Sequence, residues 1–341
     1  MPPFSLVAGS SGSARMVHMT DAVRERFERF ARDEAPGRSA VYAQWAEGIV
    51  ADAELQTVLA RISPQHRQPP LVFAVSRLRG APVGEYAAWR AFVLADAEGL
   101  VAECERRTVQ TNEPLRMAAL LPALSLIDGP ITLLELGAAA GFCLYPDRCS
   151  YRILDSRGAE RAHLDPAAGP SRLELTSVVD GVLPRLRVPQ VVWRTGVDLA
   201  PIDVRNAGDR AWVDTLTWPG EHQRAERIAA AVDIVSADPP RLLAGDAAAR
   251  LAELTASAPR GATLVISTPG MLVYLPRDAR EELIHRIRAT GARWVTIDPA
   301  RVHEGWGEDG FAVGLDGHAI ADADPLGRWW EWRTDTEPDA A

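Results

Sequence analysis

The sequence predicts an α/β protein with a mainly parallel twisted sheet, an antiparallel pair of strands at its C-terminal end, and an all-helical N-terminal domain. Three observations predict this. Up to about residue 128 the apolar residues recur at helical spacing. From residue 129 onward, short apolar segments alternate with amphipathic helical ones. The first of those segments, ITLLEL at 131–136, runs directly into a Gly-rich turn, GAAAG, at 137–141.

The N-terminal part is expected to contain an arm and then a helical cap domain. Residues 1–19 are rich in Ser, Gly and Ala and are expected to be disordered. Thr20 can cap a first helix, and a second is expected over 39–61. Apolar segments follow at 71–78 and 86–104, and Asn112 precedes a last helix. The helical domain is placed at 20–128.

The second domain is placed at 129–334, with a tail at 335–341. Strands are expected at 131–136, 151–154, 190–197, 241–244, 263–267 and 293–298, with helices at 218–231, 247–256 and 277–290. An insertion at about 149–188 is expected to form a small antiparallel excursion. FAVGLDGHAI and GRWWEWR, near the end, are interpreted as a pair of antiparallel strands.

Composition excludes several classes of function. A net charge of -9 argues against bulk binding to nucleic acid or anionic membranes. There is no lysine, which excludes Schiff-base enzymes and Walker A phosphate loops. Three irregularly spaced cysteines predict neither a disulfide framework nor a zinc site. Without a secretory signal or an apolar run of membrane-spanning length, we expect a cytoplasmic protein.

The Gly-rich turn has a physical reason to bind a ligand. Glycine is needed where a backbone turns sharply or approaches a ligand closely. A helix following Gly141 would present free N–H groups to a carboxylate or phosphate. The spacing E-x-G-x-x-x-G differs from the dinucleotide spacing G-x-G-x-x-G.

This segment resembles the first motif of class I S-adenosylmethionine-dependent methyltransferases, E/D-x-G-x-G-x-G, with Ala139 at the middle glycine. The resemblance implies a Rossmann-like methyltransferase fold and S-adenosylmethionine as cofactor. It extends in order to GVDL at 196–199, GDA at 245–247 and the end of TLVIS at 263–267. The cofactor-binding residues that it implies are Glu135, Gly137, Ala138, Ala139, Gly141, Asp198, Leu199, Gly245, Asp246, Ala247 and Ser267.

Alternatives remain for the two aspartates. Asp198 is the preferred ribose ligand, with a turn-stabilising or helix-capping role as its alternative, and Asp246 could simply cap the next helix. Gly137 and Asp198 are 61 positions apart, longer than the usual interval of roughly one βα unit. Asp155, at the end of YRILD, is therefore a second candidate for the ribose ligand.

A longer resemblance is to the bacterial family DUF2332, which is common in actinobacteria. The residues that carry it include QTNEPLR at 110–116, ELGAAAGFCLYPDR at 135–148, RTGVDLAPIDV at 194–204 and TLTWPGEHQRAERIAAA at 215–231. It implies a Rossmann-like fold but no substrate. The chain departs from the family pattern at Phe142-Cys143, where Leu-Asn is usual, and at Ile266-Ser267, where a Phe-His pair is frequent.

Methyl transfer depends chiefly on positioning, with a base to remove a proton. Candidate catalytic residues are His222 and Tyr274. Candidate substrate-binding residues are Arg194, Trp218, Arg224 and Thr268, and Gln110 and Asn112 could close over the cofactor. Structural alternatives stay open for three of these sites: His222 could simply be exposed, Arg194 could form an ion pair with Asp198 or Asp203, and residues 110–112 could make capping and loop hydrogen bonds. HEGWGEDG, which contains His303, Glu304 and Trp306, is a substrate lid or an ordinary loop. No pattern predicts a metal.

We therefore expect an S-adenosylmethionine-dependent transferase, most simply a methyltransferase acting on a small polar or carboxylate-bearing molecule. Three alternatives stay open. The same cofactor could serve alkyl transfer or cyclisation. A nicotinamide-dependent oxidoreductase is disfavoured by the absence of G-x-G-x-x-G. The chain could also be a non-catalytic ligand-binding protein of the same fold. The expected partner is a small-molecule substrate, and a homodimer is possible.

Overall fold

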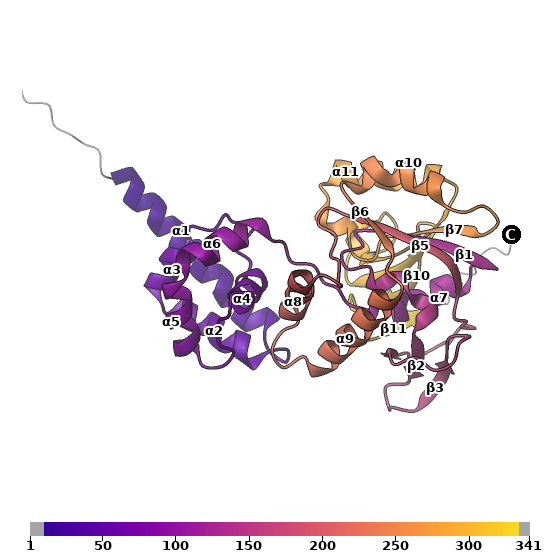
Figure 1. Ribbon diagram of the computed structural model, residues 1–341, viewed down its shortest axis with the longest axis horizontal. Coiled ribbons are helices and arrows are strands. Elements are labelled where there is room, and N and C mark those ends of the chain that lie inside the picture. The colour runs from indigo at the N-terminus through magenta and orange to yellow at the C-terminus, as the bar shows by residue number, and fades with distance from the viewer. Residues whose placement is uncertain (1–9, 334–341) are drawn as a thin grey trace, which may run out of the picture. The chain divides into compact units, whose positions relative to one another are not determined.

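The computed structural model describes residues 10–333, which divide into two compact units (Figure 1). The helical unit contains residues up to Thr111 together with the segment 207–225. The sheet-containing unit contains residues 112–206 and those from Glu226 onward. The helix α7 (Arg116–Ser125) packs on sheet strands, so residues 112–128 belong with the sheet. The expected tail at 335–341 and residues 1–9 of the expected arm lie outside the described residues.

The helical unit is built from eight helical segments: α1 (Ser10–Arg29) with its π-helical continuation η1 (Phe30–Glu34), α2 (Ala40–Val50), α3 (Ala53–Leu59), α4 (Pro69–Leu78), α5 (Tyr86–Ala95), α6 (Ala97–Arg106) and α8 (Ala207–Leu216). Two predictions are corrected here. Thr20 lies inside α1, which begins at Ser10. The helix expected at 39–61 is divided, because Asp52 caps α3 by accepting a hydrogen bond from the Leu55 N–H at 3.0 Å.

Aromatic side chains form the core of the helical unit. Tyr42, Trp45, Phe73 and Trp89 are completely buried. The rings of Trp45 and Trp89 stack with centroids 4.9 Å apart, and Phe73 meets both edge-on. No helix was expected at α8, which packs against α4. The Arg77 guanidinium of α4 holds the end of α8 by donating to the carbonyl oxygens of residues 215 and 217.

The main sheet of the second unit has eight strands in the order β11-β10-β9-β8-β7-β1-β5-β6. Five of these strands are parallel: β1 (Pro130–Leu136), β5 (Gln190–Asp198), β6 (Arg241–Ala244), β7 (Thr263–Ser267) and β8 (Arg293–Pro299). They confirm five of the six predicted strands; the sixth, at 151–154, does not belong to this sheet. Antiparallel strands complete the sheet: β9 (Phe311–Leu315), β10 (His318–Ala323) and β11 (Trp330–Trp332).

The C-terminal end therefore has three antiparallel strands and not two. FAVGLDGHAI is itself a hairpin, because Asp316 and Gly317 both adopt positive φ, at 53° and 90°. Such a pair forms the type I′ turn of a two-residue hairpin, and the Asp-Gly dipeptide is its sequence signal.

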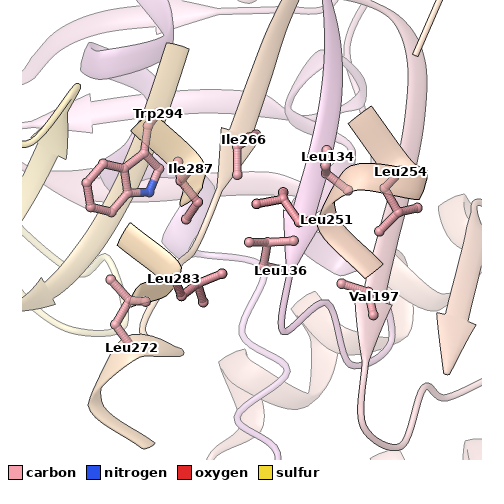
Figure 2. Close-up of a cluster of buried hydrophobic side chains, with 10 residues drawn as sticks. All are labelled: Leu134, Leu136, Val197, Leu251, Leu254, Ile266, Leu272, Leu283, Ile287 and Trp294. Atoms are coloured by element: carbon pink, nitrogen blue, oxygen red, sulfur yellow. The ribbon is translucent and has the colours of Figure 1, made fainter. Parts of the chain in front are cut away.

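One face of the main sheet is covered by α10 (Ala247–Ser257) and α11 (Arg277–Ala289), which lie beside each other (Figure 1). Figure 2 shows Leu251 and Leu254 of α10 and Leu283 and Ile287 of α11 packed on the strands. Leu134 and Leu136 of β1 point into this core. Since side chains alternate along a strand, Glu135 between them points to the opposite face, on the side of α7.

Two segments near the Gly-rich turn differ from expectation. The insertion forms a separate three-stranded sheet, β3-β2-β4, made of β2 (Ser150–Leu154), β3 (Glu160–Leu164) and β4 (Glu174–Val178). β2 pairs antiparallel with β3 but parallel with β4. The helix expected after Gly141 is replaced by two 3-10 turns, η2 (Phe142–Leu144) and η3 (Pro146–Arg148). Pro146 disfavours the helical conformation of the residue before it.

Candidate functional site

The Gly-rich turn lies at the carboxyl end of β1 and is bonded to the end of β5. The N–H groups of Gly137 and Ala138 both donate to the carbonyl oxygen of Val197, and the Ile202 N–H donates to the carbonyl oxygen of Ala139. Gly137 has a φ of 78°, and a Cβ there would come within 2.8 Å of the Cβ of Met271. Glycine is required at Gly137 on both counts.

Ala139, which occupies the middle position of the motif, also has a left-handed backbone, with a φ of 48°. An L-residue pays roughly 1–2 kcal/mol for this conformation. Asp198 holds it there, since its Oδ2 accepts a hydrogen bond from the Ala139 N–H at 2.8 Å. Its Oδ1 accepts from the Ala200 N–H at 2.9 Å. The acid that ends β5 therefore fixes the turn that follows β1.

Asn112 supports the turn from the other side. Its φ is 41°, and its Oδ1 accepts a hydrogen bond from the Ala140 N–H at 3.1 Å. The Nδ2 of Asn112 is buried and has no hydrogen-bond partner. Two non-glycine residues with left-handed backbones thus meet at one turn, and such strain concentrates at functional sites.

Glu135 adds a second unsatisfied polar atom. Its side chain is buried, and its Oε2 has no hydrogen-bond partner. Burial raises the pKa of this carboxyl well above its ordinary value; Arg116 opposes the rise and Asp198 adds to it. Burial likewise raises the pKa of the neighbouring Cys143 thiol, with a contribution from Glu135, so Cys143 is unsuited to act as a thiolate.

Register places Glu135 centrally in the sheet. It pairs with Gly196 of β5 on one side and with Ser267 of β7 on the other. A Cβ on Gly196 would come within 2.5 Å of the Cβ of Ala138, so the turn packs closely over β5. The Ser267 side chain is buried. The predicted residues Glu135, Gly137, Ala138, Ala139, Asn112, Asp198 and Ser267 therefore come together at one sheet edge.

The remaining cofactor candidates have mixed roles. The Gly245 N–H donates to the carbonyl oxygen of Asp198. Asp246 caps α10, because its Oδ1 accepts from the Ala249 N–H at 2.9 Å, and Ala247 is the first residue of that helix. Gly141 ends the turn. Leu199 follows β5 and is 80% exposed. Asp155 follows β2 in the small sheet, where its Oδ1 accepts from the N–H groups of residues 157 and 159.

Arg194 has a structural partner that the sequence did not suggest. Its guanidinium pairs with both carboxylate oxygens of Asp147 at 3.0 Å and donates to the Leu144 carbonyl oxygen. It also lies over the ring of Tyr145, 4.3 Å from the centroid. The Arg194 side chain thus binds the two 3-10 turns to β5, in place of the expected pair with Asp198 or Asp203.

Four predicted site residues lie in the helical unit: Gln110, Trp218, His222 and Arg224. The Trp218 ring packs among Phe30 and Tyr42, and the guanidinium of Arg38 lies 3.6 Å from its centroid. Arg224 pairs with Glu221 and donates to the Thr111 carbonyl oxygen. His222 begins α9 (His222–Ala237) and is exposed. Tyr274 and Thr268 belong to the sheet-containing unit, where Tyr274 is 75% exposed and Thr268 is buried.

Two residues at the turn were missed by sequence reasoning. Arg116 donates to the carbonyl oxygens of Pro269 and Pro325, so it joins α7 to the segments after β7 and β10. Glu113 forms an ion pair with Arg227 at 3.1 Å, and its side chain is completely buried. Both belong to the QTNEPLR segment, so a cluster of charged residues next to Asn112 was the available signal.

Among residues 10–333, no three His, Cys, Asp or Glu side chains gather so as to hold a metal ion. No helix in the same part of the chain is long and apolar enough to cross a membrane.

The fold and the site define an α/β protein whose mixed, mainly parallel sheet carries a Gly-rich turn at its carboxyl edge. Two acids flank this turn: Glu135 is buried, and Asp198 binds the backbone of the turn. The chain belongs to the family DUF2332, described as an uncharacterized protein conserved in bacteria, whose family model matches residues 24–332. Among proteins with curated functions, none matches the chain.

Proposed function

We propose that the protein binds S-adenosylmethionine at the Gly-rich turn and transfers a group from it, most simply a methyl group, to a small polar or carboxylate-bearing molecule. The observation that carries the proposal is the strained turn after β1, held by Asp198 and Asn112 and lined by two unpartnered polar atoms. The sheet order and the chemistry of these atoms support it.

The sheet order supports a ligand at this edge. Numbered along the chain, the five parallel strands lie in the order 3-2-1-4-5, as in nucleotide-binding doubly wound sheets. In such sheets ligands bind outside the carboxyl ends of the strands, where the order reverses. That point lies between β1 and β7, next to Gly137 and Ser267.

The polar atoms match the groups that this cofactor carries. The unpartnered Nδ2 of Asn112 is a donor suited to a carboxylate, and the unpartnered Oε2 of Glu135 is an acceptor suited to an ammonium group or a hydroxyl. Each Asp198 oxygen accepts a backbone hydrogen bond, and carboxylate oxygens are acceptors of the kind that bind ribose hydroxyls. When bound, the cofactor would supply an electrophilic carbon on a sulfonium.

Exposed apolar side chains flank the same edge. Leu199 follows β5, and Tyr274 lies in the 3-10 turn η4 (Leu272–Tyr274) that follows β7. They are 80% and 75% exposed. An adenine ring or a substrate has flat apolar surface that such side chains can cover. We therefore assign Leu199 and Tyr274 to ligand contact.

Calorimetry with S-adenosylmethionine and S-adenosylhomocysteine tests the proposal. We expect the intact chain to bind both and Asp198→Ala to weaken binding at least about tenfold, since a charged hydrogen-bond acceptor contributes about 1.5–3 kcal/mol. Asp155→Ala is the matched control, because Asp155 also ends a strand and accepts two backbone hydrogen bonds. It should leave the affinity unchanged.

Each other outcome has a meaning. If the intact chain does not bind either compound, the proposal is rejected. If Asp155→Ala weakens binding and Asp198→Ala does not, the ribose site is assigned to Asp155. Titration of NADH against the same samples tests the nicotinamide alternative. Binding without release of S-adenosylhomocysteine in the presence of small amines, acids and phenols favours a ligand-binding protein. The mass of any product distinguishes methyl transfer from alkyl transfer or cyclisation.

A further inference from the structure

A chain of buried polar side chains ends on one aspartate at the carboxyl end of β8. The Trp294 Nε1–H donates to Thr268 Oγ1 at 2.9 Å, and the Thr268 hydroxyl donates to Thr296 Oγ1 at 2.9 Å. The Thr296 hydroxyl lies 2.5 Å from Asp298 Oδ2 and 2.9 Å from the Thr268 carbonyl oxygen. His303 Nε2 lies 3.0 Å from the same Oδ2. The Asp298 carboxylate is therefore fixed in orientation by its neighbours.

The contact assigns the tautomer of His303. A carboxylate oxygen only accepts hydrogen bonds, so Nε2 carries the proton and Nδ1 carries the free lone pair. Both side chains are secluded: that of His303 is 5% exposed and that of Asp298 is completely buried. The Oδ1 of Asp298 has no partner among residues 10–333. A buried acceptor without a partner costs about 1–3 kcal/mol, which a structural role would not require.

Strand register places this pair at the edge that carries the Gly-rich turn. Glu135 of β1 pairs with Ser267 of β7, which pairs with Val295 of β8. Gly137 lies two residues after Glu135, and Asp298 lies three residues after Val295, both toward the carboxyl ends of the strands. β7 alone lies between β1 and β8, and neighbouring strands are about 4.8 Å apart, so the two positions are about 10 Å apart along the sheet edge. A ligand of cofactor and substrate size spans that distance.

The ring of Trp306 covers the imidazole of His303. It stacks on this imidazole with centroids 3.9 Å apart and an interplanar angle of 27°. Its Nε1–H donates to the Gly317 carbonyl oxygen at 3.0 Å, and the side chain is buried. The residues on either side, 304–305 and 307–310, are exposed. Trp306 also packs in a small buried cluster with Ala300, Ala312 and Ala319, so opening of this loop has to withdraw its ring from that cluster.

We propose that His303 is the proton acceptor of the reaction, that Asp298 is its positioning residue, and that the loop 304–310 opens to admit the substrate. The inference rests on the proposed function. When an amine or hydroxyl of the substrate is alkylated, its bond to the transferred carbon forms as the carbon–sulfur bond breaks. The electron pair of that bond stays on sulfur, and the proton released by the substrate passes to His303 Nδ1.

Carbethoxylation by diethyl pyrocarbonate, mapped by mass spectrometry on the folded full chain, tests the inference. The reagent needs an accessible imidazole lone pair, so we expect His303 to react in the wild type through loop opening. In Asp298→Asn the side-chain amide can donate to Nε2 and invert the tautomer, as in the aspartate variants of catalytic triads. We expect His303 to react at least about tenfold more slowly there.

The pair His163 and Asp165 provides a matched control in the small sheet. His163 Nε2 lies 3.6 Å from Asp165 Oδ1, and both side chains are about one-third exposed, 36% and 35%. Asp165→Asn should leave the reactivity of His163 unchanged, since no buried geometry fixes its tautomer. Thermal unfolding of each variant verifies that it is folded. If Asp298→Asn does not fold, Trp306→Ala replaces it as the test variant. Removal of the ring that covers His303 should accelerate the modification of His303.

The inference is overturned by a His303 that reacts only when the chain is unfolded in urea, or by one that reacts equally fast in wild type and Asp298→Asn. Unchanged reactivity in Trp306→Ala would also contradict it. Calorimetry separates this from the proposed function. Binding of S-adenosylmethionine by a chain with an unreactive His303 rejects only the dyad. A reactive, Asp298-dependent His303 without such binding supports the dyad and rejects the proposed cofactor.

Discussion

Replacing Glu135 by glutamine tests whether the central strand of the sheet carries a desolvated acid. The carboxyl group lies in the interior, with Oε2 unpartnered. Burial raises its pKa well above the ordinary 4.5, although Arg116 opposes the shift. Glutamine has nearly the same shape and does not titrate, so the variant removes the protonation equilibrium and retains the packing.

The sign follows from proton linkage. Because the native carboxyl holds its proton more strongly than the unfolded one, unfolding releases a proton at pH values between the two pKa values. The contribution of the protonated Glu135 carboxyl to the free energy of unfolding is complete below the pKa of the unfolded state and is lost as the pH rises toward the pKa of the native state. The slope is up to about 1.4 kcal/mol per pH unit for one proton. The free energy of unfolding of Glu135→Gln minus that of wild type should therefore increase with pH.

Urea unfolding at pH 5, 6, 7 and 8 measures this difference. Any constant cost of burying the amide cancels when values at successive pH are compared. Leu254→Ala is the control: Leu254 is completely buried in the core of Figure 2 and does not titrate. Its loss, about 2–5 kcal/mol, should be the same at every pH. A Glu135→Gln difference that stays flat from pH 5 to 8 would refute the argument that this carboxyl is desolvated.

Three further predictions concern the turn and the helical unit. Ala139→Gly should raise the free energy of unfolding by up to about 1 kcal/mol by relieving a φ of 48°, and a loss in urea unfolding would contradict the strain. Gly196→Ala should cost about 1–3 kcal/mol, because its Cβ would lie 2.5 Å from that of Ala138; Ala138→Gly should restore most of it, whereas an undiminished loss would argue against the contact. For Asp52, burial raises the pKa, but hydrogen bonds from Arg90, the Leu55 N–H and the Tyr86 hydroxyl outweigh it, so the pKa is lowered. Asp52→Asn should cost about 1–2 kcal/mol at pH 7, a penalty that disappears as the pH falls below 3.8 through the lowered pKa, and a penalty independent of pH would exclude the ion pair.

Local chemistry explains what could be predicted. The strands at 241–244 and 263–267 were predicted at their observed bounds, because each is a short apolar run between turn residues. The capping role left open for Asp246 is present, since its carboxylate needs only the next three residues to form its bond. The helix expected after Gly141 was wrong, although Pro146 was a readable signal against it.

Other features had no local signal. Arg194 could have paired with any of several aspartates, and only the packing of the 3-10 turns brought Asp147 to it. Trp218 follows α8, whose place in the helical unit depends on Arg77, more than a hundred residues earlier. Partners so distant in sequence are chosen by the shape of the whole core, which a pattern within one segment does not encode.

The sequence by itself determined that a buried strand ends in a Gly-rich turn, that a second strand ends in Asp198, and that the chain contains no lysine. These follow from residue type and spacing, because backbone freedom and side-chain alternation are local properties. Only the tertiary structure decided that Asp198 binds the turn, that Asn112 reaches Ala140, and that Glu135 and Asp298 each retain an unpartnered oxygen. Hydrogen bonds and burial depend on which strands become neighbours, and that choice is made by the packing of the sheet as a whole.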